Sequence, residues 1–444
     1  MSLKDQIFLF SERLLTPLSF IPDPVRVGFG YLKATNSIKR DQQSDPKIAE
    51  ERIFQQMRKL VIDATRNVEF YRKFYREKSF IPEDMRSIAD WKYVPIVTKG
   101  DFQKFALEER CAIDVAGKPA NTGGTSGAPL EFLLEKNIVS IEWAHMHAIW
   151  KARGYRSSQL KLRIGGAYFD SDIPLSFHPR HNEYIVNANC SMDRVVDAVI
   201  RLSRVHIFRW VHGYPSMVAD FAHTLSRSNE VWADVFKRRL YGVLLGSEFP
   251  VPVYRDPISR ILSTNIVSWY GHSEMAILAG EIVDGIYQSL PTYGYAEAVL
   301  SDSGVEHRLV CTALHNRAHP FIRYDTGDLI QPVSSVGGSL AFKITEGRIG
   351  DFILDRSGRK LALTSIIFGR HHTAFDDLLH LQVRQDAPGK ITLLVVPRCS
   401  IIDMAPMRAG FDFNGLDIDW QLELVSKPLR TKAGKVTLKV SDQS

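Results

Sequence analysis

The feature that most constrains the fold is an alternation of short apolar segments with longer amphipathic ones, which begins after Pro119. The short segments predict β-strands, and the longer ones, such as residues 137–153, predict α-helices. Strands that alternate with helices indicate a layered α/β domain with parallel strands. Three of the predicted strands end in small or polar residues, in VHGYPS, LLGSE and WYGHSE. Because ligands bind beyond the carboxyl ends of parallel strands, we expect a binding site there.

The two ends of the chain have different patterns. Residues 1 to about 105 are predicted to be mostly helical, and the apolar residues of 53–64 fall on one helix face. From about residue 348 onward, strand-like segments such as KITLLVVP indicate a smaller α+β unit. We therefore predict an α/β protein with a large N-terminal domain, residues 1–347, and a small, mobile C-terminal α+β domain, residues 348–444.

Charge and cysteine usage limit the classes of partner. The chain has 444 residues and a formal net charge of +6 at pH 7. Nucleic acid or a phosphorylated small molecule would each suit this charge, but no zinc finger, RNP-type strand or long basic helix accompanies it, so we expect no nucleic-acid partner. The four cysteines are far apart and include no C-x-x-C pair: Cys111, Cys190, Cys311 and Cys399. They argue against a disulfide framework and a local zinc site, and they indicate a cytoplasmic location.

Membrane contact is an open question only at the N-terminal segment. No uninterrupted apolar run approaches the roughly 18–20 residues of a membrane span, so we expect no span. Residues 7–21 are rich in aliphatic and aromatic side chains. They either form a helix that packs on the protein's own core, which is the favoured interpretation, or make peripheral contact with a membrane surface.

A glycine-rich stretch, PANTGGTSGAPLEF, occupies residues 119–132. A Walker A loop would carry a lysine and open a helix, whereas this stretch has no lysine in its glycine run and leads into a predicted strand. Its backbone N–H groups and the hydroxyls of Thr122, Thr125 and Ser126 suit phosphate oxygens. Taken alone, the stretch is also explained as a flexible turn.

Five short segments follow one another along the chain: TGGTSGAPL, YGHSE, RYDTGD, GRIGD and RTKAGKV. In this order they resemble the motifs of the adenylate-forming superfamily, which includes the acyl-CoA synthetases. The resemblance is closest to the phenylacetate–CoA ligase-like branch with its CapK-type members, to which the segment NVEFYRKFYRE is also similar. It implies an enzyme that uses ATP and Mg²⁺ to activate a small carboxylic acid as an acyl-adenylate and then transfers the acyl group to CoA.

The resemblance assigns the nucleotide to particular residues. Such a site needs cations and fixed donors because two anions must approach each other. Tyr270 would stack on adenine, Asp328 would accept hydrogen bonds from the ribose hydroxyls, Ser273 would touch phosphate, and Arg348 would reach the nucleotide. The loop residues would hold the β- and γ-phosphates: Thr122, Gly123, Gly124, Thr125, Ser126 and Gly127. Two further positions would be close to the nucleotide: Glu248 and Gly271.

Catalytic and substrate roles follow from the same resemblance. Lys435 would bridge the carboxylate and the α-phosphate, which neutralises charge in the transition state, and Glu274 would hold Mg²⁺. Glu281 is a candidate for a second acidic group near the metal. The residues that would line the acyl site are His212, Tyr214 and Gly246. Each of these residues also has a structural explanation that needs no ligand. Asp328 could be a turn residue, Tyr270 a core residue, Lys435 a solvated surface residue, and the histidines part of the scaffold.

Departures from the family pattern leave the second step open. Gly350 occupies the hinge position, where the family has Asp or Lys, and glycine permits the rotation that a hinge needs. After RSGRK the usual segment is replaced by LALTS, and the branch's cysteine and histidine metal set is not found. The acceptor is therefore a thiol, most simply CoA, or an amine, for which surface polysaccharide synthesis is an analogy with CapK-type proteins. A non-catalytic nucleotide-binding scaffold is the alternative of another class.

Overall fold

The computed structural model describes residues 16–121, 130–169, 172–283, 285–301, 304, 306–346, 352–367, 373–398, 404–431 and 436–440. The contacts of the chain form two compact units, and each unit is assembled from separate stretches of sequence. The first unit contains Met1–Phe20, Ser157–Ser268 and Ile349–Ser444. The second unit contains Ile21–Arg156 and Trp269–Arg348.

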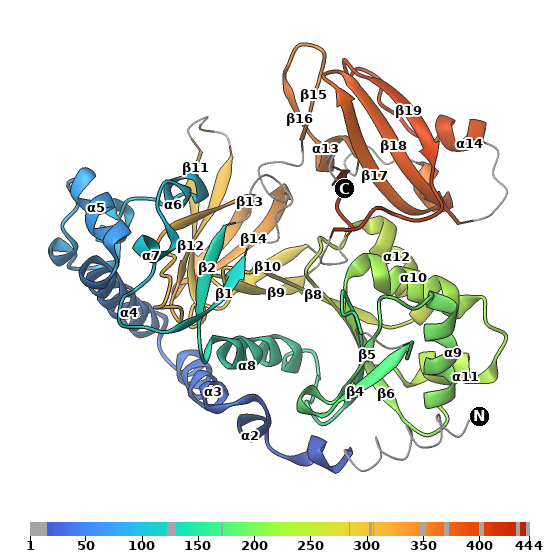
Figure 1. The fold of residues 1–444 in the computed structure, drawn as a ribbon, viewed down its shortest axis with the longest axis horizontal. Helices are drawn as coiled ribbons and strands as arrows, with labels where there is room; N and C mark the ends of the chain where they lie inside the picture. Colours follow the sequence, from blue (N-terminus) through green and yellow to red (C-terminus); the bar gives the residue numbers. More distant parts are fainter. Residues whose placement is uncertain are drawn as a thin grey trace. The chain divides into compact units, whose positions relative to one another are not determined.

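A mostly parallel sheet is the centre of residues 157–268 in the first unit (Figure 1). Its strands are, in spatial order, β4 (Leu175–His178), β5 (Glu183–Val186), β3 (Leu160–Ile164), β6 (Phe208–Gly213), β7 (Gly242–Leu245) and the first half of β8 (Asn265–Gly271). All neighbouring pairs are parallel except β4 and β5, which are antiparallel. This sheet confirms the predicted layered α/β fold.

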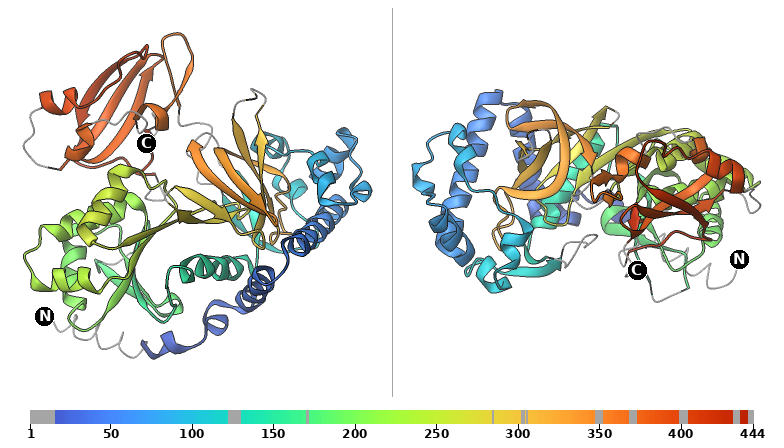
Figure 2. Two further views of the ribbon diagram at one scale, coloured as in Figure 1. Left: turned by 180° about the vertical axis from the view of Figure 1, so that it is seen from behind. Right: turned by 90° about the horizontal axis from the view of Figure 1, so that it is seen from above.

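Helices cover the apolar face of this sheet. They are α9 (Met192–Leu202), α10 (Pro215–Ser226), α11 (Val231–Arg239) and α12 (Pro252–Leu262). Figure 2 shows them in green, gathered beside the strands. Leu162, Tyr184 and Val211 of the strands share one buried core with Val199 and Phe221 of the helices. Since successive strand side chains point to opposite faces, the residues between these apolar ones lie on the other face of the sheet.

The C-terminal part of the first unit is an α+β structure, as predicted. Its sheet has the order β19 (Asp419–Leu424), β18 (Lys390–Pro397), β17 (Leu378–Ala387) and β20 (Lys439–Val440). The remaining elements are β15 (Phe352–Leu354), β16 (Lys360–Ala362), α13 (Leu363–Ile367), η5 (Thr373–Asp377) and α14 (Met404–Ala409). Buried residues of this sheet, such as Val383, belong to the same hydrophobic core as α10 and α12.

An antiparallel sheet is the centre of the second unit. Its strands are, in spatial order, β11 (Gly294–Leu300), β12 (His307–Ala313), β13 (Tyr324–Val336), β14 (Ser339–Glu346), β10 (Ile286–Ser289), β9 (Leu278–Val283) and the second half of β8. The prediction of parallel strands did not anticipate this sheet. Within β8, residues up to Ser268 pair with β7 in parallel, and residues from Trp269 pair with β9 in antiparallel, so one strand changes the sense of pairing.

Helices make up most of the N-terminal part of the second unit, as predicted. They are α2 (Asp23–Val27), α3 (Phe29–Gln42), α4 (Pro46–Asn67), α5 (Glu69–Glu77), η2 (Pro82–Asp84), η3 (Ile88–Tyr93), α6 (Lys99–Gln103), α7 (Leu107–Arg110) and α8 (Ile138–Lys151). Asp45 caps α4 through the backbone N–H of Lys47, with Pro46 at the first helical position. The predicted apolar face of α4, which includes Ile53 and Met57, is buried against the antiparallel sheet.

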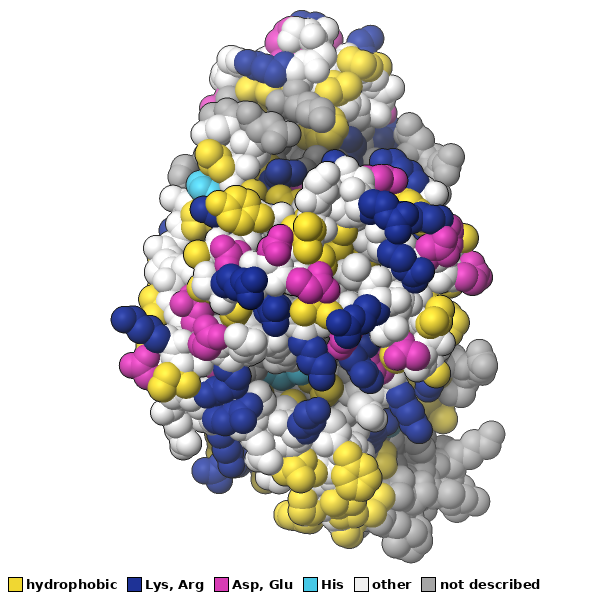
Figure 3. Space-filling model, turned by 90° about the vertical axis from the view of Figure 1, so that its left-hand side faces the viewer, with side chains coloured by type: hydrophobic (Ala, Val, Ile, Leu, Met, Phe, Trp, Pro, Cys, Tyr) yellow, Lys and Arg dark blue, Asp and Glu magenta, His cyan; other side chains and the backbone are white. Residues whose placement is uncertain are grey.

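The predicted N-terminal apolar segment lies largely outside the described residues. Its last part forms η1 (Thr16–Phe20), in which Phe20 is 78% exposed. No helix in the described part of the chain is both long enough and apolar enough to cross a bilayer. On the face shown in Figure 3, lysine and arginine side chains are interspersed with aspartate and glutamate side chains.

Candidate active site

The predicted site residues divide into those that the structure describes and those that it does not. Outside the described residues lie the glycine loop, the GRIGD arginine and the C-terminal lysine: Thr122, Gly123, Gly124, Thr125, Ser126, Gly127, Arg348 and Lys435. The hinge candidate Gly350 also lies outside. The loop connects β1 (Gly117–Asn121) and β2 (Glu131–Glu135), which pair in antiparallel, with Asn121 opposite Glu131.

Tyr270 and Asp328 are brought together in the second unit. The Tyr270 hydroxyl donates a short hydrogen bond to the Asp328 carboxylate, and only 6% of Asp328 is exposed. The Tyr270 ring packs edge-on against Phe342, with 5.8 Å between the ring centroids. The two residues are 58 positions apart in sequence. They meet because β8 and β13 belong to the same sheet, in which β14, β10 and β9 lie between them.

A bulge in β13 presents Asp328. Arg308 pairs with Leu329 and Val310 pairs with Asp325, so residues 326–328 bulge out of the ladder opposite Leu309. The DTGD sequence favours this bulge because Gly327 has φ of +78°, and its N–H donates to Asp325 Oδ1 at 3.0 Å. The backbone N–H of Asp328 donates to Thr326 Oγ1 at 3.1 Å. These bonds hold the Asp328 backbone in place.

The residues after β8 form a tight turn that carries Ser273 and Glu274. The N–H of Met275 donates to the carbonyl of His272 at 3.0 Å, and Met275 has the positive φ of +52°, which a non-glycine residue rarely adopts. Ser273 is exposed, whereas Glu274 is 6% exposed. The Glu274 carboxylate lies 3.3 Å from Nδ1 of His272. The turn thus presents a hydroxyl outward and holds a carboxylate close to an imidazole.

A second carboxyl, which the sequence analysis did not single out, lies near this turn. Glu142 of α8 accepts a hydrogen bond from the Tyr293 hydroxyl at 3.4 Å. Burial raises the pKa of Glu142 to about 7, although the Tyr293 bond and the nearby His272 act in the opposite direction. The signal in the sequence was a lone acidic residue inside an otherwise apolar and aromatic helix.

Glu281 has a clear structural role. Its Oε1 accepts a hydrogen bond from the N–H of Gly285 at 2.9 Å, which closes the β9–β10 turn. Glu281 is 6% exposed. A second acidic ligand to the metal therefore stays a prediction for this residue.

His212, Tyr214, Gly246 and Glu248 gather at the carboxyl ends of β6 and β7 in the first unit. The N–H of Gly246 donates to the carbonyl of Gly213 at 3.2 Å, and the N–H of Tyr214 donates to the carbonyl of Ile164 at 3.0 Å. Gly213 is required at its position because a Cβ there would lie 1.9 Å from the carbonyl oxygen of Ile164. Polar residues therefore follow neighbouring strands at one edge of the sheet, as the strand endings predicted.

Glu248 is held by three hydrogen bonds. Its carboxylate accepts from the backbone N–H of Ser216 at 3.0 Å, from the Ser216 hydroxyl at 3.0 Å and from the N–H of Val436 at 2.8 Å. Burial raises its pKa, and these bonds oppose the rise. Ser247, which precedes it, has a φ of +68°. Glu248 thus fixes the N-terminus of α10 and the backbone at Val436.

Charged residues on β3 and β5 were missed as site residues. Lys161 and Glu183 are fully buried and form an ion pair of 3.0 Å, and Arg163 lies 3.3 Å from the same carboxylate. The sequence analysis named none of these three residues. The available signal was the strand LKLRI, in which charged residues alternate with apolar ones in the middle of a sheet.

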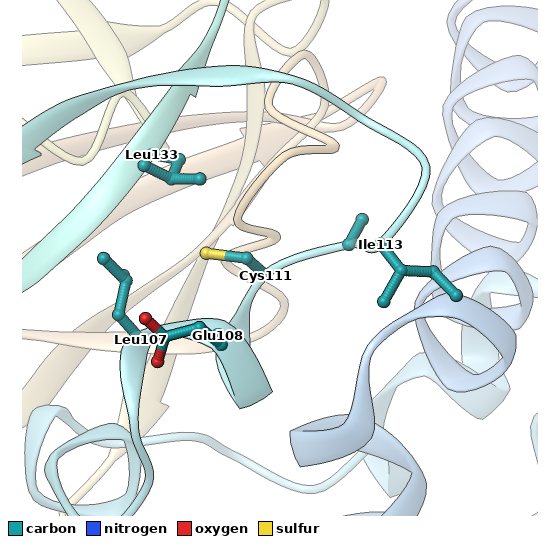
Figure 4. A pocket seen from close by; sticks show the side chains of 6 residues that line it. Leu107, Glu108, Cys111, Ile113 and Leu133 are labelled. Atoms are coloured by element: carbon teal, nitrogen blue, oxygen red, sulfur yellow. The ribbon is translucent and has the colours of Figure 1, made fainter.

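A surface hollow elsewhere in the second unit has no connection with these residues. It is lined by Leu107, Glu108, Cys111, Ala112, Ile113 and Leu133 (Figure 4). Burial raises the pKa of the Cys111 thiol to about 11, so the thiol is protonated at neutral pH and is a poor nucleophile.

The arrangement of elements has known counterparts among solved structures. The chain is similar to 2-hydroxyisobutyryl-CoA ligase in the postadenylation state in complex with R3-HIB-AMP, with a TM-score of 0.62, 17% identity, and coverage of 88% of this chain and 89% of that chain. The chain has the fold of adenylate-forming ligases. It is also similar to the GH3.15 acyl acid amido synthetase, with a TM-score of 0.58, 12% identity and coverage of 89% and 93%.

Sequence comparisons add no closer relative to this adenylate-forming fold. No family model matches the sequence, and no curated protein matches it. A third solved structure with the fold, the ATP-bound RpMatB-BxBclM chimera B3, has a TM-score of 0.52 and 14% identity and is covered over 68% of its length. The fold is therefore established by structure, while the branch and the substrate belong to the proposal below.

Proposed function

We propose that the protein is an AMP-forming carboxylate ligase of the phenylacetate–CoA ligase-like type. An oxygen of the substrate carboxylate attacks the α-phosphorus of ATP, the bond to the β-phosphate oxygen breaks, and pyrophosphate leaves. A thiol, most simply that of CoA, then attacks the acyl carbon of the adenylate and displaces AMP. The observation that carries the proposal is the hydrogen bond between Tyr270 and Asp328, close in sequence to the turn that bears Ser273 and Glu274. The fold is shared with a ligase whose structure was solved with R3-HIB-AMP.

The described residues suit the nucleotide chemically. Asp328 offers a carboxylate that accepts from ribose hydroxyls, and its hydrogen bond from Tyr270 fixes where an aromatic ring would meet adenine. Ser273 offers an exposed hydroxyl for phosphate. Mg²⁺ keeps several waters and phosphate oxygens and needs only one or two protein carboxylates, so Glu274 alone fits that requirement. Magnesium would neutralise phosphate charge.

The roles of the residues outside the described ranges complete the proposal. The loop from Thr122 to Gly127 would hold the β- and γ-phosphates, Arg348 would contact the nucleotide, and Lys435 would bridge carboxylate and α-phosphate. We further propose that residues 348–444 swing about Gly350 between the two half-reactions, and that the enzyme works in the cytoplasm. The acyl site would be formed by His212, Tyr214 and Gly246.

An amine acceptor is the second candidate. The likeness to an acyl acid amido synthetase, which covers 89% of this chain, favours it. The first half-reaction would be unchanged, and an amine nitrogen would attack the adenylate instead of a thiol. Surface polysaccharide synthesis, as in CapK-type proteins, is the corresponding setting by analogy.

The test is ATP–pyrophosphate exchange with a panel of carboxylic acids, followed by product analysis with CoA or amines. We expect at least one acid to support exchange, and Lys435→Ala to reduce exchange by orders of magnitude while ATP binding is retained. ATP binding without exchange for any acid would instead identify a nucleotide-binding scaffold. Consumption of an amine rather than CoA would select the second candidate.

A further inference from the structure

A group of charged side chains on β3 and β5 of the first unit carries more positive than negative charge. Lys161 and Glu183 are both 0% exposed and neutralise each other across 3.0 Å, and the Lys161 ammonium also donates to the carbonyl of His181 at 2.6 Å. Arg163 adds a second positive charge on the same face of β3. Two cations and one carboxylate leave a net charge of +1 in this group.

The neighbouring imidazoles do not supply a compensating charge. A neutral or protonated histidine carries no negative charge, so His178, whose Nδ1 lies 3.7 Å from Glu183, leaves the surplus in place. Burial lowers the pKa of His212 to about 3, and Lys161 and Arg163 lower it further against the opposing effect of Glu183. His212 is therefore neutral at physiological pH.

Arg163 is the member of this group that meets solvent. Its side chain is 37% exposed, whereas those of Lys161 and Glu183 are fully buried. One guanidinium nitrogen, NH1, lies 3.3 Å from Glu183 Oε1. A guanidinium has five N–H donors in a planar fork, so the contact with Glu183 uses only part of them and leaves donors for a second anion.

Arg163 also lies at the predicted acyl site. It pairs with His212 across β3 and β6, one residue before each strand ends. A Cβ on Gly165, two residues later, would lie 3.8 Å from the ring of Tyr214. Arg163 lowers the pKa of Tyr214, which burial and Glu248 raise. The exposed cation and Tyr214 thus share the carboxyl-terminal edge of the sheet, where ligands bind.

We propose that the acid activated by this protein carries a second anionic group, a carboxylate or a phosphate, and that Arg163 binds it. A planar guanidinium matches both groups through paired N–H donors. This inference rests on the proposed function and defines its substrate class. The Lys161–Glu183 pair joins β3 to β5 near the starts of both strands, and the shared carboxylate orients Arg163.

The experiment compares matched acids that differ only in the second anion. Exchange rates are measured for hexanoate against adipate, for phenylacetate against 4-carboxyphenylacetate, and for each monoacid against its phosphorylated counterpart. We expect kcat/KM to be at least about 10-fold higher for one class of dianion, because a bidentate charged pair adds substantial binding energy. The class of dianion that raises kcat/KM, dicarboxylate or phosphorylated acid, identifies the anion that Arg163 binds.

Three variants make the test specific. Arg163→Met is expected to reduce the dianion preference at least about 10-fold while monoacid exchange persists, and Arg163→Lys is expected to restore part of it. Arg209→Met is the matched control, because Arg209 is the second residue of β6, near the opposite end of the strand, and donates to the carbonyl of Arg239. It should keep the wild-type preference. Thermal unfolding of each variant checks that the sheet is intact.

The outcomes separate this inference from the proposed function. Exchange with monoacids alone, or a dianion preference that Arg163→Met leaves unchanged, would overturn the inference and leave the carboxylate ligase standing. Absence of exchange with every acid would overturn both. A preference that is lost in Arg163→Met and kept in Arg209→Met would support both.

Discussion

Glu248 shows how one carboxylate can connect distant parts of a unit. It accepts two hydrogen bonds from Ser216 at the start of α10 and one from the backbone of Val436. A carboxylate at a helix N-terminus satisfies free N–H groups and interacts favourably with the helix dipole. The resemblance placed this residue near the nucleotide, and the structure gives it a structural task that is independent of any ligand.

Replacing Glu248 tests that task. Glu248→Ala leaves the buried donors of Ser216 and Val436 without their acceptor, and we expect the free energy of unfolding to fall by about 1–3 kcal/mol. Glu248→Gln keeps a side-chain oxygen and should lose less. Urea unfolding measures both. Glu77→Ala, at an exposed position on α5, is the control, and an equal loss in that variant would contradict the structural role.

Tyr270 combines an aromatic ring with a hydrogen bond to Asp328, and the two functions can be separated. Tyr270→Phe keeps the ring and removes the bond, so we expect the Kd for ATP to rise several-fold, because one positioning hydrogen bond contributes about 1 kcal/mol. Tyr270→Ala should raise it further. Isothermal titration with ATP gives both values. Identical affinities in all three proteins would show that neither ring nor bond contacts the nucleotide.

At the level of elements, the pattern of apolar residues predicted the strands and helices whose formation depends on neighbouring residues in sequence. The alternation after Pro119 predicted β3, β6, β7 and their helices because apolar strands and amphipathic helices have different periods. The polar strand endings predicted a binding site at the carboxyl ends of the strands, and the Gly246–Gly213 hydrogen bond shows that the ends of β6 and β7 lie side by side. The sheet from β9 to β14 was not anticipated, although most of its antiparallel pairs join strands that follow one another in sequence. The pairing of β10 with β14, which brings these hairpins into one sheet, joins strands that are far apart in sequence.

The candidate site was predictable to a similar degree. The motifs named Tyr270 and Asp328 separately, but the bulge that presents Asp328 depends on the register of β12 against β13, which no single stretch encodes. Arg163 was overlooked because a charged residue in a strand becomes informative only when its neighbours on other strands are known. Its partner Glu183 lies 20 residues away in sequence.

One cluster attaches the C-terminal sheet to α10 and α12. His380 of β17 bonds to Asp220 at 2.6 Å and to the Tyr254 hydroxyl at 3.1 Å, and Arg430 also contacts Asp220 at 3.0 Å. Asp220→Ala removes the shared acceptor, so we expect faster amide exchange along β17 and a loss of about 1–3 kcal/mol in the free energy of unfolding. Asp197→Ala, on the exposed face of α9, should leave both unchanged. Unaltered exchange along β17 in Asp220→Ala would show that apolar packing alone holds the sheet.

At the level of the whole molecule, each compact unit draws on stretches that are far apart in sequence. The chain leaves the first unit after Phe20, returns to it at Ser157, leaves it again within β8, and returns after Arg348. The predicted division after residue 347 describes which part would move during catalysis, and it stays a prediction. Both units contain buried histidines whose pKa values are strongly lowered, which gives the whole protein a common response to acid.

Burial lowers the pKa values of His145, His212 and His319 to about 3 each. In the unfolded chain such groups take up a proton near pH 6.5. Between pH 6.5 and about 3 the unfolded state therefore binds more protons, and stability falls as pH falls, by up to about 1.4 kcal/mol per pH unit for each histidine. Glu142, whose pKa is raised to about 7, acts in the opposite direction from about pH 7 to 4.5.

His319 offers the cleanest test of this acid response. Its ring is 0% exposed and packs among Phe102, Phe132 and Phe321, so phenylalanine fits the same aromatic surroundings. We expect His319→Phe to flatten the decrease in unfolding free energy between pH 7 and pH 5, since one site of proton uptake by the unfolded chain is removed. His307→Phe, at a half-buried position on β12, is the control. Urea unfolding at both pH values measures the slopes, and equal slopes for wild type and His319→Phe would mean that this histidine does not couple folding to protonation.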